Sequence, residues 1–546
     1  MQSSYADRFD WESITPSKQL TYVPCHGVFQ CAHLLLPMDW DAPVEQRWLN
    51  TVAIALIKLP ANVSDVADPR YKGDLFVNPG GPGMSGVEFV KRRGKYLSDI
   101  VNDDSGVFDI MGFDPRGLLH STPRFLCFMK GNLQGRDLFS QRERADPWLN
   151  ITLPRVWAKA AAFAQMCDSG NDTSPEASIK SYMSTASVAG DLVGMIEAAG
   201  ALRGTKLRQL QAMEKFHGRE GPKASRVKEL LYRPGEEKLQ FWGFSYSTTI
   251  GAYFASMFPN RVKRMVLDGN SDVQDWSSGR WLRLLSNANR SLGSLYTACF
   301  EAGADRCALF DTRGAEAIGS TVLSTLAKLK TDPVPLWSEG MLYPEVLTYE
   351  MVIEAIVTAL YGPYTKFPTL ARALLSLNNR SNLSTHDIES LLPRQGVRLS
   401  DDGYASKDCV EEDNRWKHEV DVAVSCADTD SMLHNRSLVD YMKWADDLER
   451  RTGLFGSFLS SDSTIACHDW PVSTRFRFDG PFGGTTSHPL LFVGNLMDPA
   501  GHPDYLDVMT ELFNGSVALS TNASGHCSPA APGACRTGYP SIYATR

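Results

Sequence analysis

Residues 239–255 read LQFWGFSYSTTIGAYFA, which is an apolar run, a tight Gly-x-Ser turn and a second apolar run. A buried strand that turns sharply into a helix presents its serine hydroxyl above a sheet, and the helix N-terminus beneath favours developing negative charge. The bare Gly-x-Ser pattern recurs by chance, but between a strand and a helix it is typical of a nucleophile elbow. We therefore predict that Ser245 is a catalytic nucleophile.

Short apolar runs bounded by glycine and proline flank this stretch, at residues 51–57, 74–78, 107–114, 489–494 and 516–520. Runs of this kind are typical of buried parallel strands, and residues 188–199 show apolar side chains at helical spacing. Alternating strands and helices indicate an α/β fold, a sheet with helices on both faces.

The strand predicted at 266–269 is separated by about 220 residues from the next convincing core strand, which is far too long for a plain connection. Residues 349–361 and 437–451 within this interval have helical patterns. We predict a large, mainly helical inserted cap at 270–465. The sheet domain would then comprise residues 1–269 and 466–546, the second part carrying the acid and the histidine.

A second, smaller insertion is predicted at about 201–238, where ten Lys/Arg and five Asp/Glu side chains surround Gly218 to Gly221. We expect a solvated loop or an exposed helix, because charge runs usually form solvated surface, and a basic binding patch is the alternative.

The segment that follows the strand at 74–78 supplies a candidate oxyanion hole, because residues 76–86 read FVNPGGPGMSG. Glycines after a strand let backbone N–H groups face a reacting oxygen. We expect the Gly80 or Gly81 amide, with the Tyr246 amide, to be the two donors. A phosphate-binding loop would need Gly-Lys-Ser/Thr, which is absent.

The acid and the base should follow the serine in that order. His502 and His526 are the histidines that lie after the large insertion and near the end of a C-terminal strand. Asp498 follows the strand at 489–494, at the sheet edge where active-site groups of α/β proteins collect. We predict that His526 is the base and Asp498 orients it, with His502 in a surface loop.

Five motifs recur in order along the chain, and together they resemble the α/β-hydrolase family of prolyl and tripeptidyl aminopeptidases, in its fungal-type secreted branch with a tripeptidyl-aminopeptidase-like C-terminal segment. They are Asn78-Pro79-Gly80-Gly81-Pro82-Gly83, Phe113-Asp114-Pro115-Arg116-Gly117, Trp242-Gly243-Phe244-Ser245-Tyr246, Asp498-Pro499 and Gly525-His526. The resemblance implies an α/β-hydrolase core, a helical cap, a Ser245–Asp498–His526 triad, and disulfides at Cys299/Cys307 and Cys426/Cys467. Ser247 departs from the usual glycine of the elbow, and Ala500-Gly501-His502-Pro503 departs from the usual residues after Asp-Pro.

The predicted function is cofactor-independent serine hydrolysis of an acyl bond, with a peptide or small acyl substrate and release of N-terminal residues or short peptides. The alternatives are an esterase, thioesterase or acyl-transfer enzyme, and a catalytically silent binding protein of the same fold. A nucleotide fingerprint and a spaced metal-ligand motif are both missing, so no cofactor and no metal are expected. An aminopeptidase needs a carboxylate for the substrate ammonium, and the candidates are Asp272, Asp275, Glu301, Glu345, Glu350 and Glu354.

Charge and hydropathy argue against two classes of partner. The 546 residues include 63 acids and 55 bases, a net charge of −8, which disfavours a nucleic-acid or anionic-membrane binder. Uninterrupted apolar runs stay well short of eighteen residues, so we expect no membrane-spanning segment. Nothing in the sequence indicates an oligomeric state.

Sequons and cysteines bear on the compartment. The chain has 11 cysteines, including the close pairs Cys25/Cys31, Cys299/Cys307 and Cys527/Cys535, and nine Asn-x-Ser/Thr sequons, at Asn62, Asn150, Asn171, Asn289, Asn379, Asn382, Asn435, Asn514 and Asn522. Together they favour the secretory pathway or secretion, with a leader missing from the sequence. The N-terminus itself lacks a signal-peptide pattern, which leaves the cytoplasm as the alternative. We expect Cys299/Cys307 and Cys527/Cys535 to be bridged, because such short loops close with little entropy loss.

Overall fold

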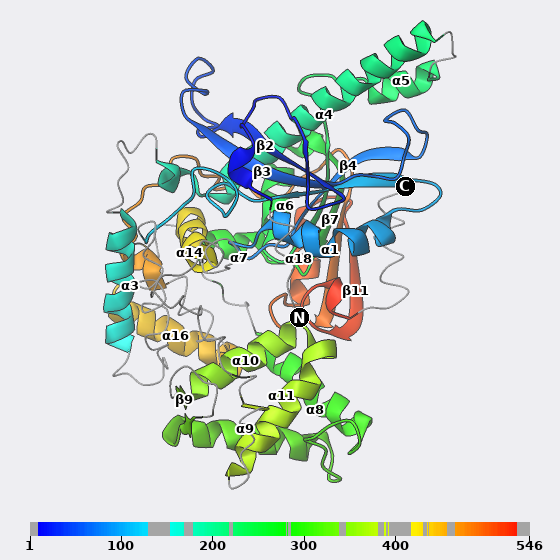
Figure 1. Ribbon diagram of the computed structural model, residues 1–546. Coiled ribbons are helices and arrows are strands. Elements are labelled where there is room, and N and C mark those ends of the chain that lie inside the picture. Colours follow the sequence, from blue (N-terminus) through cyan, green and yellow to red (C-terminus); the bar gives the residue numbers. More distant parts are fainter. Residues whose placement is uncertain are drawn as a thin grey trace.

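A nine-stranded sheet forms the centre of the computed structural model (Figure 1), in the order β1-β2-β3-β5-β4-β6-β7-β10-β11. The structure describes residues 9–128, 153–168, 178–217, 222–279, 281, 286–337, 345–380, 387–388, 391, 416–429, 434, 436–455 and 465–531. The strands of this sheet are β1 (Val23–Cys25), β2 (Phe29–Pro37), β3 (Thr51–Leu59), β4 (Tyr71–Asn78), β5 (Val107–Phe113), β6 (Leu239–Phe244), β7 (Val262–Asp268), β10 (Leu490–Met497) and β11 (Val517–Ser524).

The strand directions and the crossing order define the α/β-hydrolase fold. β1, β2, β3 and β5 pair antiparallel in turn, and from β5 onward each neighbour is parallel. From β2 to β11 the sheet follows the α/β-hydrolase order, in which β4 and β5 exchange places so that β4 lies beside β6. The predicted fold class is therefore confirmed. Parallel β4, β6, β7 and β10 all end at one edge, which brings the segments after them together.

Helices cover both faces of the sheet, as predicted. One core cluster joins the sheet to α4 (Thr185–Phe216), α6 (Ser247–Met257) and α18 (Asp504–Leu512), while α1 (Gly86–Val101) packs on the other face. Strands β5 and β6 are buried throughout, which explains their continuous apolar sequences. α3 (Leu153–Asp168) joins the first cluster through Phe163 and Cys167.

The interval between β7 and β10 is mainly helical, as predicted, and it contributes to two cores. Helices α8 (Ala288–Ala302), α9 (Ala315–Thr331), α10 (Tyr349–Tyr361) and α11 (Pro363–Asn378) share a separate cluster and form the lobe at the bottom of Figure 1. The two-stranded sheet of β8 (Val334–Leu336) and β9 (Glu345–Leu347) joins that lobe. By contrast, α14 (Trp416–Asp428) and α16 (Leu438–Thr452) pack into the core that contains α4 and α6. The domain boundaries stay a prediction.

The described part of the charged segment at 201–238 contains the end of a long helix, a short second helix and the approach to β6. α4 continues well past the predicted 188–199, and with α5 (Ala224–Leu230) it projects from the sheet domain at the top of Figure 1. Among the described helices, α4 alone has the length and apolarity to cross a membrane, but most of that stretch is buried inside the protein. It packs against α6 as a core helix of the fold.

Four disulfides connect described cysteines, at Cys25–Cys31, Cys127–Cys167, Cys299–Cys307 and Cys426–Cys467. Disulfides persist in oxidising compartments, so the cysteines indicate an extracellular or secretory location. The expected Cys527–Cys535 bridge is wrong, because Cys527 is a buried free thiol whose Sγ lies 3.3 Å from the Asp268 carbonyl oxygen. Its side chain is directed into the core, and Cys535 lies outside the described residues.

Candidate active site

Ser245 lies on the turn between β6 and α6, with the strained backbone of a nucleophile elbow. Its φ is +56°, a left-handed conformation that non-glycine residues rarely adopt. The Ser245 amide donates to the Asp268 carbonyl oxygen at 2.9 Å, which holds the turn against β7. Gly243 permits the close approach of strand and helix, because a Cβ there would lie 2.7 Å from the Ser247 carbonyl oxygen.

The unusual Ser247 has a specific partner. Its side chain is fully buried, and its hydroxyl donates to the Asn78 side-chain oxygen at the end of β4. The same oxygen accepts the Gly80 amide at 3.0 Å, while the Asn78 amide group donates to the Phe113 carbonyl oxygen. The hydroxyl that replaces the usual glycine therefore ties α6 to the glycine loop.

The glycine loop meets the elbow at a contact that only glycine allows. A Cβ on Gly80 would lie 2.5 Å from the Phe244 carbonyl oxygen and 2.8 Å from the Tyr246 amide nitrogen. The Gly80 amide is occupied by Asn78, whereas the Gly81 and Tyr246 amides have no acceptor within the described part of the chain. Gly81 and Tyr246 line the same cavity as Ser245.

His526 and Asp498 form a tight pair at the same edge of the sheet. His526 Nδ1 lies 2.8 Å and 3.0 Å from the two Asp498 carboxylate oxygens. The His526 ring packs edge-on against Tyr361, and its Nε2 is buried with no hydrogen-bond partner among the described residues. His526 lines the cavity beside Ser245, so this nitrogen is available to a group bound there.

Backbone amides hold the Asp498 carboxylate in place. The amides of Ala500 and Gly501 donate to one oxygen at 2.9 Å and 2.8 Å, and the Cys527 amide donates to the other at 3.0 Å. Burial alone would lower the pKa of His526, but the charge and hydrogen bond of Asp498 outweigh it and raise the pKa above its ordinary value.

Asp268, at the end of β7, is a residue of this site that the sequence reasoning did not single out. Its carboxylate accepts the Ser528 amide at 2.7 Å and the Ser528 hydroxyl at 2.5 Å, and its carbonyl accepts Ser245. Burial raises the pKa of Asp268 to about 6. The residue thus links the serine turn to the histidine loop. The sequence did contain a signal for Asp268, because this acid ends a core strand just as Asp498 follows one.

A second buried carboxylate, Asp428 on α14, supports the side chain of Tyr246. It accepts the Thr185 hydroxyl and the Trp276 indole N–H, the latter at 2.9 Å, and the Tyr246 hydroxyl lies 2.5 Å from the Thr185 hydroxyl. Burial raises the pKa of Asp428 to about 6. The inserted segment therefore reaches the residue that follows Ser245.

The cavity above Ser245 has a volume of about 130 Å³ and an acidic wall. Among the described residues that line it, Asp272, Asp275 and Asp421 carry carboxylates, and none is a lysine or arginine. Two of these belong to the acids proposed from sequence, and Asp421 on α14 was missed. Of the others, Glu301 lines a separate groove, Glu350 and Glu354 lie on α10 outside the cavity lining, and the Glu345 side chain lies outside the described residues.

The remaining residues singled out from sequence lie apart from the reacting groups. His502 accepts the Asp504 amide at the start of α18 and does not line the cavity. Trp242 is buried in the sheet core, while Trp276 forms part of the cavity wall and stacks on Trp281. Within the described residues, no group of three or more His, Cys, Asp or Glu could hold a metal ion.

Comparison with known proteins finds similarity to two peptidases and an esterase. Residues 452–538 match a protein family described as TAP-like protein. The serine protease Hip1 of Mycobacterium tuberculosis is 24% identical over 477 residues, which cover 85% of this chain and 75% of that protein. The tripeptidyl aminopeptidase of Streptomyces lividans is 27% identical over 47% of this chain and 37% of its own length. Carboxylesterase B of M. tuberculosis is 39% identical over 98 residues, 18% of this chain and 16% of that protein.

The fold and the comparisons define the chain as an enzyme, a serine hydrolase of the α/β-hydrolase class. More particularly, the resemblance to the tripeptidyl aminopeptidases is confirmed, and so is the expected C-terminal segment of that type.

Proposed function

We propose that the enzyme hydrolyses peptide amide bonds through a Ser245–His526–Asp498 triad and acts as an aminopeptidase. The Ser245 hydroxyl attacks the substrate carbonyl while His526 Nε2 accepts its proton. The Gly81 and Tyr246 amides stabilise the oxyanion, and the protonated His526 then donates to the leaving amine. Water hydrolyses the acyl-enzyme by the same groups in reverse.

The acidic cavity wall is the observation that favours an aminopeptidase. A substrate ammonium that enters this small, partly enclosed space loses its hydration and needs a carboxylate partner. Asp421 and Asp275 line the cavity from α14 and α7 (Val273–Ser278), and with Asp272 they give it an acidic wall, with no lysine or arginine among the described lining residues. The ammonium group at the N-terminus of a peptide is a cation that such an acidic wall attracts.

Covalent labelling tests the mechanism. A fluorophosphonate probe is expected to label the wild type on Ser245. Ser245→Ala should abolish labelling and lower turnover by several orders of magnitude, because triad members act as a unit. His526→Ala should do nearly as much, with His502→Ala as the matched control that keeps full activity. Full turnover in the Ser245 or His526 variant would overturn the assignment, and an unlabelled wild type would identify a silent binding protein.

Blocked substrates test the specificity. We expect N-acetylation of a tripeptide p-nitroanilide to lower kcat/KM by about 100-fold, because the acetylated substrate has no ammonium group to pair with the acidic wall. Asp421→Asn should raise KM for the free substrate and reduce the penalty of acetylation, whereas Glu301→Gln, outside the cavity, should change neither. Equal turnover of free and blocked substrates would contradict an aminopeptidase.

An esterase is the second candidate, favoured by the local identity to carboxylesterase B. It predicts faster hydrolysis of simple p-nitrophenyl esters than of any peptide amide, with the same dependence on Ser245.

Removal of N-glycans by glycosidase, read as a loss of mass, tests the proposal that the enzyme is a secreted glycoprotein.

A further inference from the structure

A second pocket lies at the opposite edge of the sheet from Ser245. It is formed where the parallel strands β4, β6 and β7 begin, with Lys72, Gln240 and Lys263 on its floor and α4 and α5 along its side. Its volume is about 260 Å³, far more than the roughly 15 Å³ that one water needs. The serine hydrolase mechanism uses none of these residues.

The pocket is positive in a negative protein. Seven Lys/Arg and four Asp/Glu residues of the described chain line it, whereas the whole chain carries −8. Three of the acids are already neutralised by arginine, in the pairs Arg203–Glu237, Arg226–Glu229 and Arg233–Glu236. The fourth acid, Asp74, is buried, and its burial together with nearby Asp109 raises its pKa to about 6. Because the three arginines are paired, the remaining positive charge of the pocket comes from its lysines.

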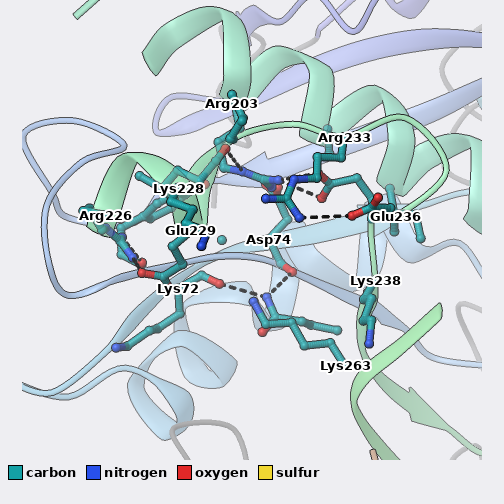
Figure 2. Close-up of a pocket in the computed structure, with 18 of the residues that line it drawn as sticks. Lys72, Asp74, Arg203, Arg226, Lys228, Glu229, Arg233, Glu236, Lys238 and Lys263 are labelled. Atoms are coloured by element: carbon teal, nitrogen blue, oxygen red, sulfur yellow. Dashed lines mark hydrogen bonds and ion pairs between the residues drawn. The ribbon is translucent and has the colours of Figure 1, made fainter. Parts of the chain in front are cut away.

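The four lysines come from different segments around the pocket (Figure 2). Lys72 lies on β4, Lys228 on α5, Lys238 just before β6 and Lys263 on β7. None of them forms an ion pair or side-chain hydrogen bond with another described residue. The buried Nε of Arg226 likewise has no acceptor in the described part of the chain. Donors without acceptors therefore surround a space large enough for a ligand.

Lys263 is the residue for which an anion matters most. Its side chain is largely buried, and burial, reinforced by Arg264 and Arg203, lowers its pKa to about 8. Glu229 and Glu237 attract it only at a distance, since neither lies within ion-pair range. A buried ammonium without a partner is unfavourable, and a bound anion would remove that cost.

We propose that this pocket binds a phosphate group, carried by a small molecule. A phosphate dianion presents several acceptor oxygens, which matches lysine donors that come from several directions better than a single carboxylate does. The volume beyond the phosphate leaves room for a small organic group, which favours a phosphomonoester over the free ion. This site is separate from the proposed aminopeptidase function and does not depend on it.

Calorimetric titration of the full chain tests the site, with inorganic phosphate and glycerol 3-phosphate as the probes. We expect saturable binding of both at millimolar concentration or below, tighter for the ester. Lys263→Gln should weaken binding by about tenfold or more, the loss of one charge-assisted hydrogen bond. Lys263→Arg keeps the charge and should keep most of the affinity. Lys328→Gln, the same charge change on the exposed face of α9, should leave binding unchanged.

Three outcomes would overturn the proposal: no saturable binding by the wild type below about 10 mM, wild-type affinity in Lys263→Gln, or equal weakening in Lys328→Gln. If Lys263→Gln unfolds, the double variant Lys72→Gln/Lys228→Gln, which changes only lysine side chains outside the protein core, gives the same comparison. Fluorophosphonate labelling of Ser245 should be unchanged in Lys263→Gln, which separates loss of this site from loss of the active site.

Discussion

Ser247 shows how one atypical residue can be accommodated in a conserved type of turn. Its hydroxyl fills the space next to β4 and donates to Asn78, whose oxygen also holds the Gly80 amide. A glycine here would let the helix approach but would leave that oxygen with one donor fewer. The residue therefore helps to fix the loop that carries the proposed oxyanion donor Gly81.

Ser247→Ala is expected to lower the free energy of unfolding by about 1–2 kcal/mol, because a buried acceptor loses a donor. It should also lower kcat more than it raises KM, since the glycine loop is less firmly held. Urea denaturation and steady-state kinetics measure the two effects. Ser320→Ala, an exposed helix serine that bonds its own backbone, is the control. A Ser247→Ala enzyme with wild-type kcat would contradict the positioning role.

The pH profile follows from the raised pKa of His526. The base must be neutral to accept a proton, so kcat/KM should fall as the pH decreases through a value above about 6.5. Asp498→Asn removes the charge that raises this pKa and leaves the lowering effect of burial. The acidic limb should then move to lower pH while kcat drops by about 10⁴-fold. If the acidic limb of the pH profile of Asp498→Asn stays in place or moves to higher pH, His526 is excluded as the base.

At the scale of elements, the Phe113-Asp114-Pro115-Arg116-Gly117 motif is structural. Asp114 accepts the Ser85 hydroxyl and the Val87 amide, which fixes the start of α1 directly after the glycine loop. Arg116 is buried and bonds Asp191 on α4 through two nitrogens, at 2.8 Å and 2.6 Å. The motif therefore joins β5 to a helix on each face of the sheet.

Breaking this pair should be costly. Arg116→Met is expected to lower the free energy of unfolding by about 3–5 kcal/mol, because Asp191 would be left buried without its partner. Arg116→Met combined with Asp191→Leu should recover a large part of that loss. Urea denaturation measures both, and Arg313→Met, which removes an exposed pair with Asp311, should change stability little. A double variant no more stable than Arg116→Met would contradict this account.

At the scale of the whole molecule, the disulfide Cys426–Cys467 joins α14, which carries Asp421 and Asp428, to the segment before β10. It closes a loop with a separation of 41 residues, whereas Cys25–Cys31 has a separation of 6. Because a longer loop restricts the unfolded chain more, removing the first should cost about 4 kcal/mol and removing the second about 2 kcal/mol.

Serine substitution of both cysteines in each pair, followed by denaturant unfolding, measures this difference. Loss of Cys426–Cys467 should also weaken discrimination between free and acetylated substrates, because Asp421 is then less firmly placed. The Cys25–Cys31 variant is the control, since its two cysteines lie in a different core cluster from α14. Equal losses of stability from the two pairs would contradict the loop-length explanation.

Some elements could not have been found from local pattern. The hairpin of β1 and β2 was missed, since buried His33 interrupts the apolar run of β2, and its strand conformation depends on pairing with β3. The continuation of α4 to Phe216 was left open, because its charged residues fit either a solvated loop or an exposed helix when read alone. Both depend on contacts that the one-dimensional pattern does not contain.

The sequence by itself determined the α/β-hydrolase core, the position of Ser245 and the class of enzyme. Apolar run length, glycine position and motif order can be recognised in the sequence without knowledge of the tertiary contacts. Only the tertiary structure brought Asp421 and Asp275 to the cavity, left Cys527 unbridged, and joined Asp268 to both the serine turn and the histidine loop. These features depend on which distant segments meet when β7, β10 and α14 pack together, and that is decided by burial across the whole chain.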